Sequence, residues 1–292
     1  MLLSNTINKG MEHLILGMKE IKQHYAPSQW QEFSQTTVLQ HPVTSIIHQC
    51  PFTHHAFTKP RSYAGDADLL DFIYGFKDLS PSLSPLGIKL CKYMQAAPAP
   101  TSVRARRDIL AQTIDQVVLE TSHPAQILSI ACGHLREAKH SIAFLSGSIG
   151  KLIAFDQDSL SLALIDYELS KDFLQTLQGS VTDLVKQKHH FENLDLVYAA
   201  GLYDYLSQPF ATRLTKIMFD MLRPQGKLLV ANFIPDHRDV GYMETFMQWN
   251  LIYRTESQLD DVAKAIPAAE IAQKQTFFEP NGNIVFLELV KA

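Results

Sequence analysis

Two adjoining stretches decide the fold, QILSIACGHLREA (126–138) and KLIAFDQDSLSLA (151–163). Each opens with a short apolar run, Gln126–Ala131 and then Lys151–Phe155, which predicts a buried strand followed by a turn and a helix. The same alternation predicts three further strands at Thr176–Val181, Leu194–Ala199 and Lys227–Phe233, with helices over 136–145, 159–174 and 208–222. Strands and helices that alternate at this interval predict an α/β fold with a doubly wound, mostly parallel sheet.

The two ends of the chain differ from this pattern. Gln273–Phe278 and Ile284–Val290 flank Asn281-Gly282, a strong turn signal, and predict a terminal antiparallel hairpin. The first part of the chain shows helical spacing over 2–25 and predicts further helices at 85–95 and 101–121. We therefore expect two domains, an N-terminal helical module over 1–121 that acts as lid and substrate module, and a sheet domain over 122–292.

Composition excludes several classes of protein. The net charge is -4 and Arg104–Arg107 is the tightest basic cluster, so we expect no nucleic-acid partner. Cys50, Cys91 and Cys132 lie far apart without metal-ligand spacing, which favours free thiols in a cytoplasmic protein and no metal site. No run approaches the roughly 18 apolar residues of a membrane span. A homodimer is left open.

The first strand-to-helix turn, Cys132-Gly133-His134, is the first candidate for ligand binding. Ligands of open α/β sheets bind beyond the carboxyl ends of the strands, where a glycine lets them approach backbone N–H groups. A plain tight turn explains Gly133 equally well. Asp156 ends the second strand, where a carboxylate can accept both hydroxyls of a ribose, or cap the next helix, as Asp158 or Ser159 also could.

Two enzyme classes bind a nucleoside in this way, dehydrogenases and methyltransferases, and the terminal hairpin favours the second. Successive segments resemble the motifs of class I S-adenosylmethionine-dependent methyltransferases: 127–138, 152–163, 194–206, 222–233 and 242–255. With KPRSYAGDADLLDFIYG (59–75), they are more narrowly similar to bacterial methyltransferases of 3-hydroxypalmitic acid methyl ester biosynthesis. The resemblance covers about 40–292. Leu135 stands where many methyltransferases have a second glycine.

The resemblance implies a Rossmann-like sheet, S-adenosyl-L-methionine as cofactor and a small-molecule substrate. It implies that Cys132, Gly133 and His134 hold the methionine part of the cofactor, and that Asp156 holds the ribose. Gln157 would lie beside the adenine, and Ser180 and Val181 would face its ring from the third strand. Ala200 and Gly201 would line the path to the methyl group, although Val181 and Ala200 could equally be core residues.

A second set of residues holds candidates for the acceptor. The candidate catalytic residues are Tyr63, Asp66 and Asp204, and the candidate substrate contacts are Arg61, Arg104, Arg107, Tyr203, Asn232, Tyr242, Trp249, Tyr253 and Arg254. Arg61 and Asp66 could equally form a surface ion pair. Tyr242, Trp249 and Tyr253 are expected on one face of a helix inserted after the fifth strand, a face that could equally pack in the core.

The nucleophile decides what the protein must supply. A carboxylate acceptor is already ionised at neutral pH and needs a cation to orient it, for which an arginine suffices. An alcohol acceptor would need a base, with Asp66, Asp204 or His134 as candidates. Since no base is obvious, we expect methyl ester formation on a (hydroxy) fatty acid or other organic acid. Methylation of N, S or hydroxyl groups, an oxidoreductase and a non-catalytic nucleoside-binding protein stay open.

Overall fold

The computed structural model describes residues 2–292 and divides into two compact units. The helical unit comprises the chain up to Arg104 together with Asp236–Asn250, and the sheet unit comprises Ala105–Pro235 and Leu251–Ala292. This differs from the division expected at 121/122, because the segment after the fifth strand belongs to the helical unit and the boundary falls inside one continuous helix, α7 (Pro98–Glu120).

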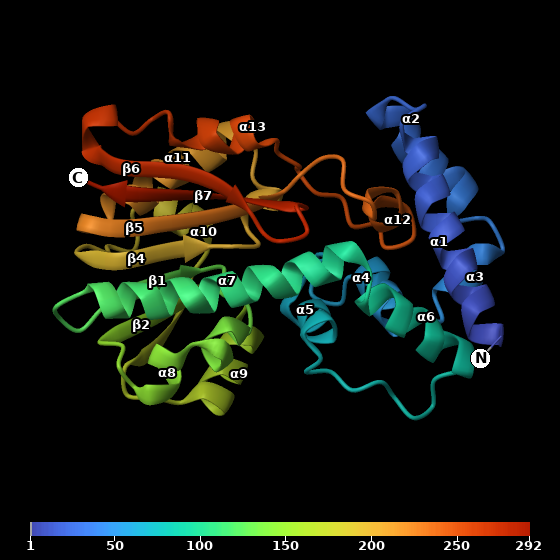
Figure 1. The fold of residues 1–292 in the computed structure, drawn as a ribbon, viewed down its shortest axis with the longest axis horizontal. Helices are drawn as coiled ribbons and strands as arrows, with labels where there is room; N and C mark the ends of the chain where they lie inside the picture. Colours follow the sequence, from blue (N-terminus) through green and yellow to red (C-terminus); the bar gives the residue numbers. More distant parts are fainter. Residues whose placement is uncertain (1) are drawn as a thin grey trace. The chain divides into compact units, whose positions relative to one another are not determined.

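The sheet unit is built on a seven-stranded sheet in the order β3-β2-β1-β4-β5-β7-β6 (Figure 1). The strands β1 to β5 are parallel, and β7 runs antiparallel to both β5 and β6. Their bounds are β1 Gln126–Ile130, β2 Lys151–Asp156, β3 Leu174–Gln178, β4 Leu194–Ala199, β5 Leu222–Phe233, β6 Ile271–Phe278 and β7 Ile284–Lys291. The predicted α/β fold, with its parallel sheet and terminal hairpin, is confirmed.

The strand order reverses between β1 and β4, which run side by side and carry the first and fourth turns of the unit. In open α/β sheets this switch point places a ligand crevice at the carboxyl ends of the two strands. All of β4 is buried, as expected for a strand covered on both faces. The sheet therefore holds the turns at 131–135 and 200–202 next to one another.

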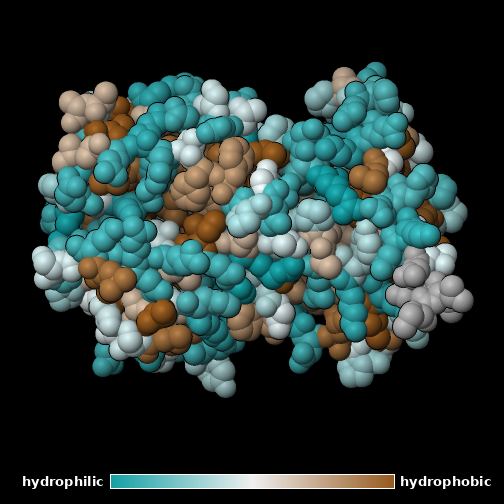
Figure 2. Space-filling view, viewed as in Figure 1, coloured by the Kyte–Doolittle hydropathy of each residue, from teal (hydrophilic) through white to brown (hydrophobic). Residues whose placement is uncertain are grey.

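Helices and short 3-10 turns connect the strands. They are a 3-10 turn at Arg136–His140, α8 Ile142–Ser146, α9 Ser159–Leu169, α10 Val181–Val185, a 3-10 turn at Tyr203–Tyr205, α11 Gln208–Asp220, α13 Glu256–Asp260, and 3-10 turns at Asp261–Ala263 and Ala268–Glu270. The main core lies where α11 packs on the sheet, with Leu214 and Met218 fully buried against strand residues such as Val197 and Leu228. The side chains of Ile142 and Leu145, on α8, are exposed. Figure 2 shows brown, hydrophobic residues scattered among teal ones on the surface.

The helical unit consists of helices, several of which begin at a proline. They are α1 Leu2–Lys22, α2 Pro27–Phe33, a π-helical turn at Ser34–Val38, α3 Val43–Ile47, α4 Pro51–Thr58, α5 Ala67–Tyr74, α6 Pro85–Gln95, the start of α7, and α12 Val240–Thr245. Gly241 explains why α12 joins this unit. A Cβ at Gly241 would lie 2.6 Å from the backbone carbon of Met18, so only a glycine lets α12 pack this closely on α1.

Three expectations for individual elements were wrong. The helix expected over 136–145 is interrupted by Ser141, whose extended backbone and side-chain bond to the N–H of Phe144 begin a new helix. The third strand ends at Gln178, three residues early, and Ser180 begins α10 instead. The helix expected to carry Tyr242 through Arg254 ends at Thr245, and Gln248 then takes a left-handed φ of 48°.

Among residues 2–292, no helix is both long and apolar enough to cross a membrane.

Candidate functional site

The turn after β1 has an unusual backbone. Residues Ala131, Gly133 and Leu135 all have positive φ, at 53°, 53° and 49°. Two of the three are not glycine, which makes such a turn uncommon. Three N–H groups of this turn are bonded within the protein: Cys132 donates to the carbonyl of Phe155, Gly133 to Asp156 and Leu135 to the carbonyl of Cys132. Leu135, at the position of the missing glycine, is fully buried and therefore packs into the core.

Asp156 connects this turn to the end of β2. One carboxylate oxygen accepts the N–H of Gly133 at 2.8 Å and the other accepts the N–H of Asp158 at 2.9 Å. Burial raises the pKa of Asp156, whereas these two N–H donors lower it. Asp158 caps α9 through the N–H of Leu160, so the cap and the candidate ribose ligand are separate residues. A carboxylate has about four acceptor positions, so two remain for a ligand.

The turns after β2 and β3 hold the residues expected around the adenine. Gln157 is exposed directly after Asp156. We expected Ser180 and Val181 on the third strand. Instead, the side chain of Ser180 caps α10 by accepting the N–H of Asp183, and Val181 is the first residue of that helix.

An aromatic group at the same place was missed by the sequence analysis. A Cβ at Gly179 would lie 2.6 Å from the ring of Phe155 and 2.8 Å from Nε2 of His189. The rings of Phe155 and His189 meet edge to face at 5.3 Å, and Phe191 stacks beyond them. The glycine before Ser180 was the available signal.

The turn after β4 receives an arginine that the sequence analysis also missed. Arg106, on α7, donates from Nη1 to the carbonyl of Ala200 at 2.8 Å, and its guanidinium lies against Gly201. Arg107, which we had named, is instead paired with the carboxylate of its neighbour Asp108 at 2.7 Å. The sequence shows the arginine cluster, but it does not show which arginine points toward the turn after β4.

A buried pair lies under the β1 turn. The hydroxyl of Tyr198, on β4, donates to Oε1 of Glu137 at 2.8 Å. Burial raises the pKa of Glu137, while the charges of Arg106 and Arg107 lower it. Neither residue was a candidate in the sequence analysis, and Tyr198 lies in a buried, mostly apolar strand.

Asp204, a candidate base, lies in the interior and is engaged. Its Oδ1 accepts the side-chain N–H of Asn232 at 2.9 Å and the backbone N–H of Phe233 at 2.8 Å. Burial raises the pKa of Asp204 to about 6, against the lowering effect of Arg106 and Arg254. The carboxylate thus joins the turn after β4 to the end of β5.

Three candidate substrate contacts belong to the same interior network, which corrects the expectation that they line a pocket. Arg254 is 1% exposed and donates to the carbonyls of Tyr203 and Leu206 and to Oδ1 of Asn232. Asn232 and Tyr203 are fully buried, and the hydroxyl of Tyr203 bonds Thr215. Tyr203 was expected after the fourth strand, Asn232 at the end of the fifth and Arg254 on a helix beyond it, but their bonds fix the loop 202–206 to the sheet. Tyr253 is half-buried in the extended segment beside Arg254.

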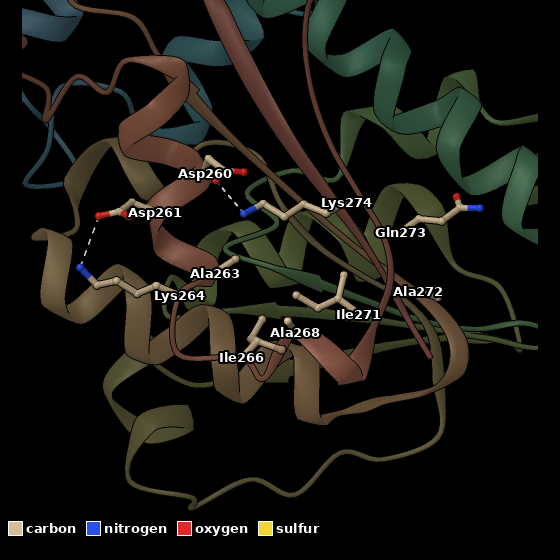
Figure 3. Close-up of a pocket in the computed structure, with 10 residues that line it drawn as sticks. All are labelled: Asp260, Asp261, Ala263, Lys264, Ile266, Ala268, Ile271, Ala272, Gln273 and Lys274. Atoms are coloured by element: carbon tan, nitrogen blue, oxygen red, sulfur yellow. Dashed lines mark hydrogen bonds and ion pairs between the residues drawn. The ribbon is translucent and has the colours of Figure 1, made fainter.

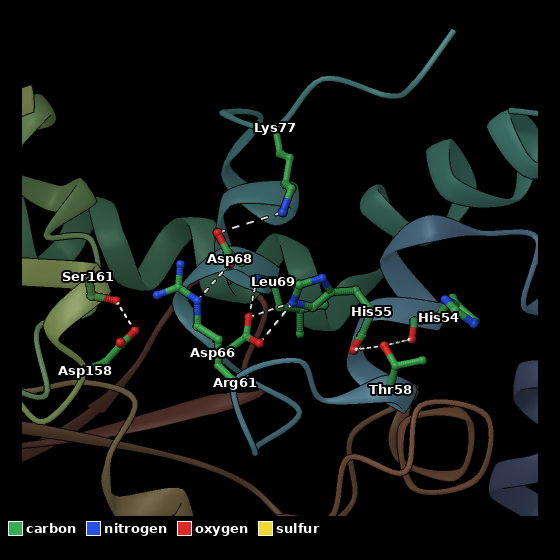
Figure 4. Close-up of polar contacts among 10 residues, drawn as sticks. All are labelled: His54, His55, Thr58, Arg61, Asp66, Asp68, Leu69, Lys77, Asp158 and Ser161. Carbon is green, nitrogen blue, oxygen red and sulfur yellow. Dashed lines mark hydrogen bonds and ion pairs between the residues drawn. The ribbon is translucent and has the colours of Figure 1, made fainter. Parts of the chain in front are cut away.

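In the helical unit, Asp66 is a helix cap. Its fully buried carboxylate accepts the N–H of Leu69 at 2.7 Å and pairs with Nε2 of His55 at 2.9 Å (Figure 4). Arg61 does not pair with Asp66 but with Asp68 at 2.8 Å. Tyr63 is half-buried in the loop between them.

His55, Asp66 and Asp68 lie close enough together to be considered for a metal ion. Asp66 is already bonded to the N–H of Leu69 and to His55. Asp68 is already paired with Arg61 and Lys77. A metal ion is therefore not needed to explain the cluster.

The remaining candidates of the helical unit have structural partners. Arg104 donates from Nη1 to the carbonyls of Ile73 and Gln95, near the ends of two helices. The hydroxyl of Tyr242 bonds that of Thr53 at 2.8 Å, and both residues are buried. Trp249 is also buried, although it does not share a helix with Tyr242. The burial of Tyr242 and Trp249 favours the core alternative for these two residues.

Two cavities of the sheet unit lie away from the switch point. One, of about 370 Å³, is bordered by the ion pairs Lys274–Asp260 and Lys264–Asp261 (Figure 3). Another, of about 600 Å³, is lined by Asp195, Arg223 and Glu288 among others. Asp195 and Arg223 lie near the beginnings of β4 and β5, so this second cavity is at the opposite edge of the sheet from Gly133 and Asp156.

No protein-family model matches the chain, and no curated protein matches it. Among solved structures, it is similar to a possible exported protein of Bordetella parapertussis, with a TM-score of 0.65 and 16% identity over 99% of this chain and 96% of that one. A magnesium protoporphyrin IX methyltransferase of Synechocystis with bound S-adenosylhomocysteine also matches, with a TM-score of 0.49 and 10% identity over 75% and 91%. So does an N-methyltransferase of Bradyrhizobium japonicum, with a TM-score of 0.45 and 13% identity over 64% and 96%. At these identities, the likeness is one of fold.

Proposed function

We propose that this chain binds S-adenosylmethionine in the sheet unit and transfers the methyl group to the carboxylate of a small organic acid. The observation that carries the proposal is the bond between Asp156 and the N–H of Gly133, which joins the acidic end of β2 to the left-handed turn after β1. A carboxylate beside a glycine turn at a switch point suits a nucleoside that carries an amino acid.

The residues present fit that cofactor. Asp156 retains acceptor positions for the ribose hydroxyls, and the turn 131–135 lies beside it, where the methionine part would bind. Gln157 and the aromatic group of Phe155 and His189 lie at the ends of β2 and β3, where the adenine would bind. When bound, the cofactor supplies a methyl group already activated by its sulfonium, so the protein's part is to align the acceptor and exclude water.

A carboxylate acceptor is favoured because two of the three candidate bases, Asp66 and Asp204, are already engaged. Asp66 caps a helix and pairs with His55, and Asp204 holds the N–H of Phe233. A carboxylate needs no base at neutral pH, since its ordinary pKa is about 4. A (hydroxy) fatty acid remains our proposal for the acceptor, on the resemblance of 59–75 and 194–206. The substrate role of the helical module, a cytoplasmic location and a homodimer stay predictions.

Calorimetry with S-adenosylhomocysteine tests the cofactor assignment. We expect the full chain to bind it with a Kd in the micromolar range or tighter, and to show no heat with NADH at the same concentration. Binding of NADH in place of S-adenosylhomocysteine would transfer the site to an oxidoreductase. No binding of either would overturn the proposal.

A further inference from the structure

The side chain of Arg106 is almost fully buried, at 5% exposed, and comes from α7 to the turn after β4. In the described part of the chain, its guanidinium makes one hydrogen bond, from Nη1 to the carbonyl of Ala200. A guanidinium has five N–H donors in a planar fork. Nε and Nη2 have no acceptor among the described residues, and neither is one of the fully buried atoms without a partner, so these donors reach the surface, where a ligand could accept from them.

The two neighbouring arginines are different. Arg104 donates to two helix carbonyls, and Arg107 is paired with Asp108. At about 100° per residue, Arg106 points away from Arg104 and Arg107, which are three positions apart and share a face of the helix. Over residues 2–292, no carboxylate oxygen lies within 4.0 Å of a guanidinium nitrogen of Arg106.

Two buried carboxylates lie near Arg106 without pairing with it. The charge of Arg106 lowers the pKa of both Glu137 and Asp204. Glu137, however, accepts a hydrogen bond from the hydroxyl of Tyr198, and Asp204 accepts from N–H groups at the end of β5. Gly201 lies on the other side, where a Cβ would be 3.6 Å from Nη2 and 3.9 Å from Nη1. A longer side chain at this position would cover the fork, whereas glycine leaves it accessible.

We propose that Arg106 is the carboxylate anchor of the site, holding an anionic oxygen pair in a bidentate manner beside Ala200 and Gly201. A guanidinium fork matches the two oxygens of a carboxylate and fixes their direction. The inference rests on the proposed function, which supplies two such carboxylates, that of the cofactor's methionine part and that of the acceptor. Both have the same chemistry, so experiment must separate the two sources.

Two pairs of probes separate them. S-adenosylhomocysteine carries a carboxylate and 5′-methylthioadenosine does not, and 3-hydroxypalmitate carries one that its methyl ester lacks. Each is titrated into the wild type, Arg106→Gln and Arg106→Lys, with Arg213→Gln as the matched control. Arg213 is an exposed arginine on α11, so its substitution changes the charge equally at a distance from the turn.

We expect Arg106→Gln to weaken the binding of one carboxylate probe by about 10- to 100-fold, the usual effect of losing a charged hydrogen-bonded pair. Its uncharged counterpart should bind as before, and Arg213→Gln should behave as the wild type. Arg106→Lys, which keeps the charge but not the fork, should lose about tenfold and decides the question if Arg106→Gln does not fold. The probe that weakens identifies the source of the carboxylate.

Unchanged binding of both carboxylate probes to a folded Arg106 variant would overturn the inference while leaving the proposed function intact. If the wild type binds 3-hydroxypalmitate but not S-adenosylhomocysteine, the proposed function fails and the acid probe still decides the role of Arg106. A wild type that binds neither carboxylate overturns both.

Discussion

At the scale of single residues, Asp156 carries the most direct prediction. Asp156→Ala removes the acceptor expected for the ribose hydroxyls and also releases the N–H of Gly133. We expect S-adenosylhomocysteine to bind about 2–3 kcal/mol more weakly by calorimetry, the scale of a lost charge-assisted contact. Asp172→Ala, which removes an exposed carboxylate after α9, should bind as the wild type. Equal affinity in both variants would remove Asp156 from the site.

Asp204 predicts a pH dependence of stability. Its pKa is raised by burial to about 6 in the folded chain, above the usual value of about 3.9 for an unfolded one. Between these values the folded state binds more protons, so this group lowers the free energy of unfolding as the pH rises from about 4 to 6. Relative to Asp204→Asn, the wild type should lose up to about 3 kcal/mol over that range.

Urea unfolding at pH 4, 5, 6 and 7 measures the effect of Asp204, with Asp172→Asn as the exposed control. The control should follow the wild type at each pH. Stability curves for the wild type and Asp204→Asn that run parallel would show that the buried carboxylate does not titrate in this range.

The sequence does not show whether a polar side chain is buried or exposed. Asp204 was expected after the fourth strand and Asn232 at the end of the fifth, as the structure has them, yet both side chains turn inward and bond to one another. A polar residue after a strand can face a ligand or hold a loop, and only the tertiary contacts separate the two. Gly133 and Asp156 were easier, since their spacing puts them at the ends of neighbouring strands.

At the scale of elements, the close approach of α12 to α1 carries a prediction. Gly241→Ala places a Cβ within 2.6–2.8 Å of the backbone of Met18 and Lys19, so one helix must shift. Overpacking of this kind costs about 1–3 kcal/mol of unfolding free energy. Gly10→Ala is the matched control, because no atom lies within 4 Å of its Cβ and alanine favours the helix by about 0.5–1 kcal/mol.

Thermal or denaturant unfolding of both glycine variants gives the comparison. Opposite signs are expected, with Gly241→Ala less stable and Gly10→Ala as stable as the wild type or more so. A Gly241→Ala variant of unchanged stability would contradict the packing of α12 on α1.

Periodicity predicted the strands better than the short helices. The apolar runs of β1, β2 and β4 were located to within a residue, because buried parallel strands are apolar throughout. The segment after β5 was misjudged because Tyr242, Trp249 and Tyr253 fall at helical spacing. The left-handed backbone at Gln248 breaks that helix, and glutamine gives no local signal for such a conformation.

At the scale of the whole molecule, the division into units does not follow the order of residues along the chain. Asp236–Asn250 follows the fifth strand in sequence but packs with the N-terminal helices, through Gly241 and through contacts such as Trp30 Nε1 to Glu244 at 2.7 Å. Residues more than two hundred positions apart thus form one core. A single sequence offers no signal for such a long-range pairing, whereas strand–helix alternation predicts the sheet locally.

We propose that the chain makes a methyl ester from S-adenosylmethionine and a small acid. The most direct measurement incubates the full chain with methyl-labelled S-adenosylmethionine and 3-hydroxypalmitate, isolates the lipid product and treats it with alkali. We expect a product one methyl group heavier than the acid. Alkali should release its label as methanol, since esters hydrolyse in base. Label that resists alkali and stays on nitrogen, sulfur or an ether oxygen would contradict it.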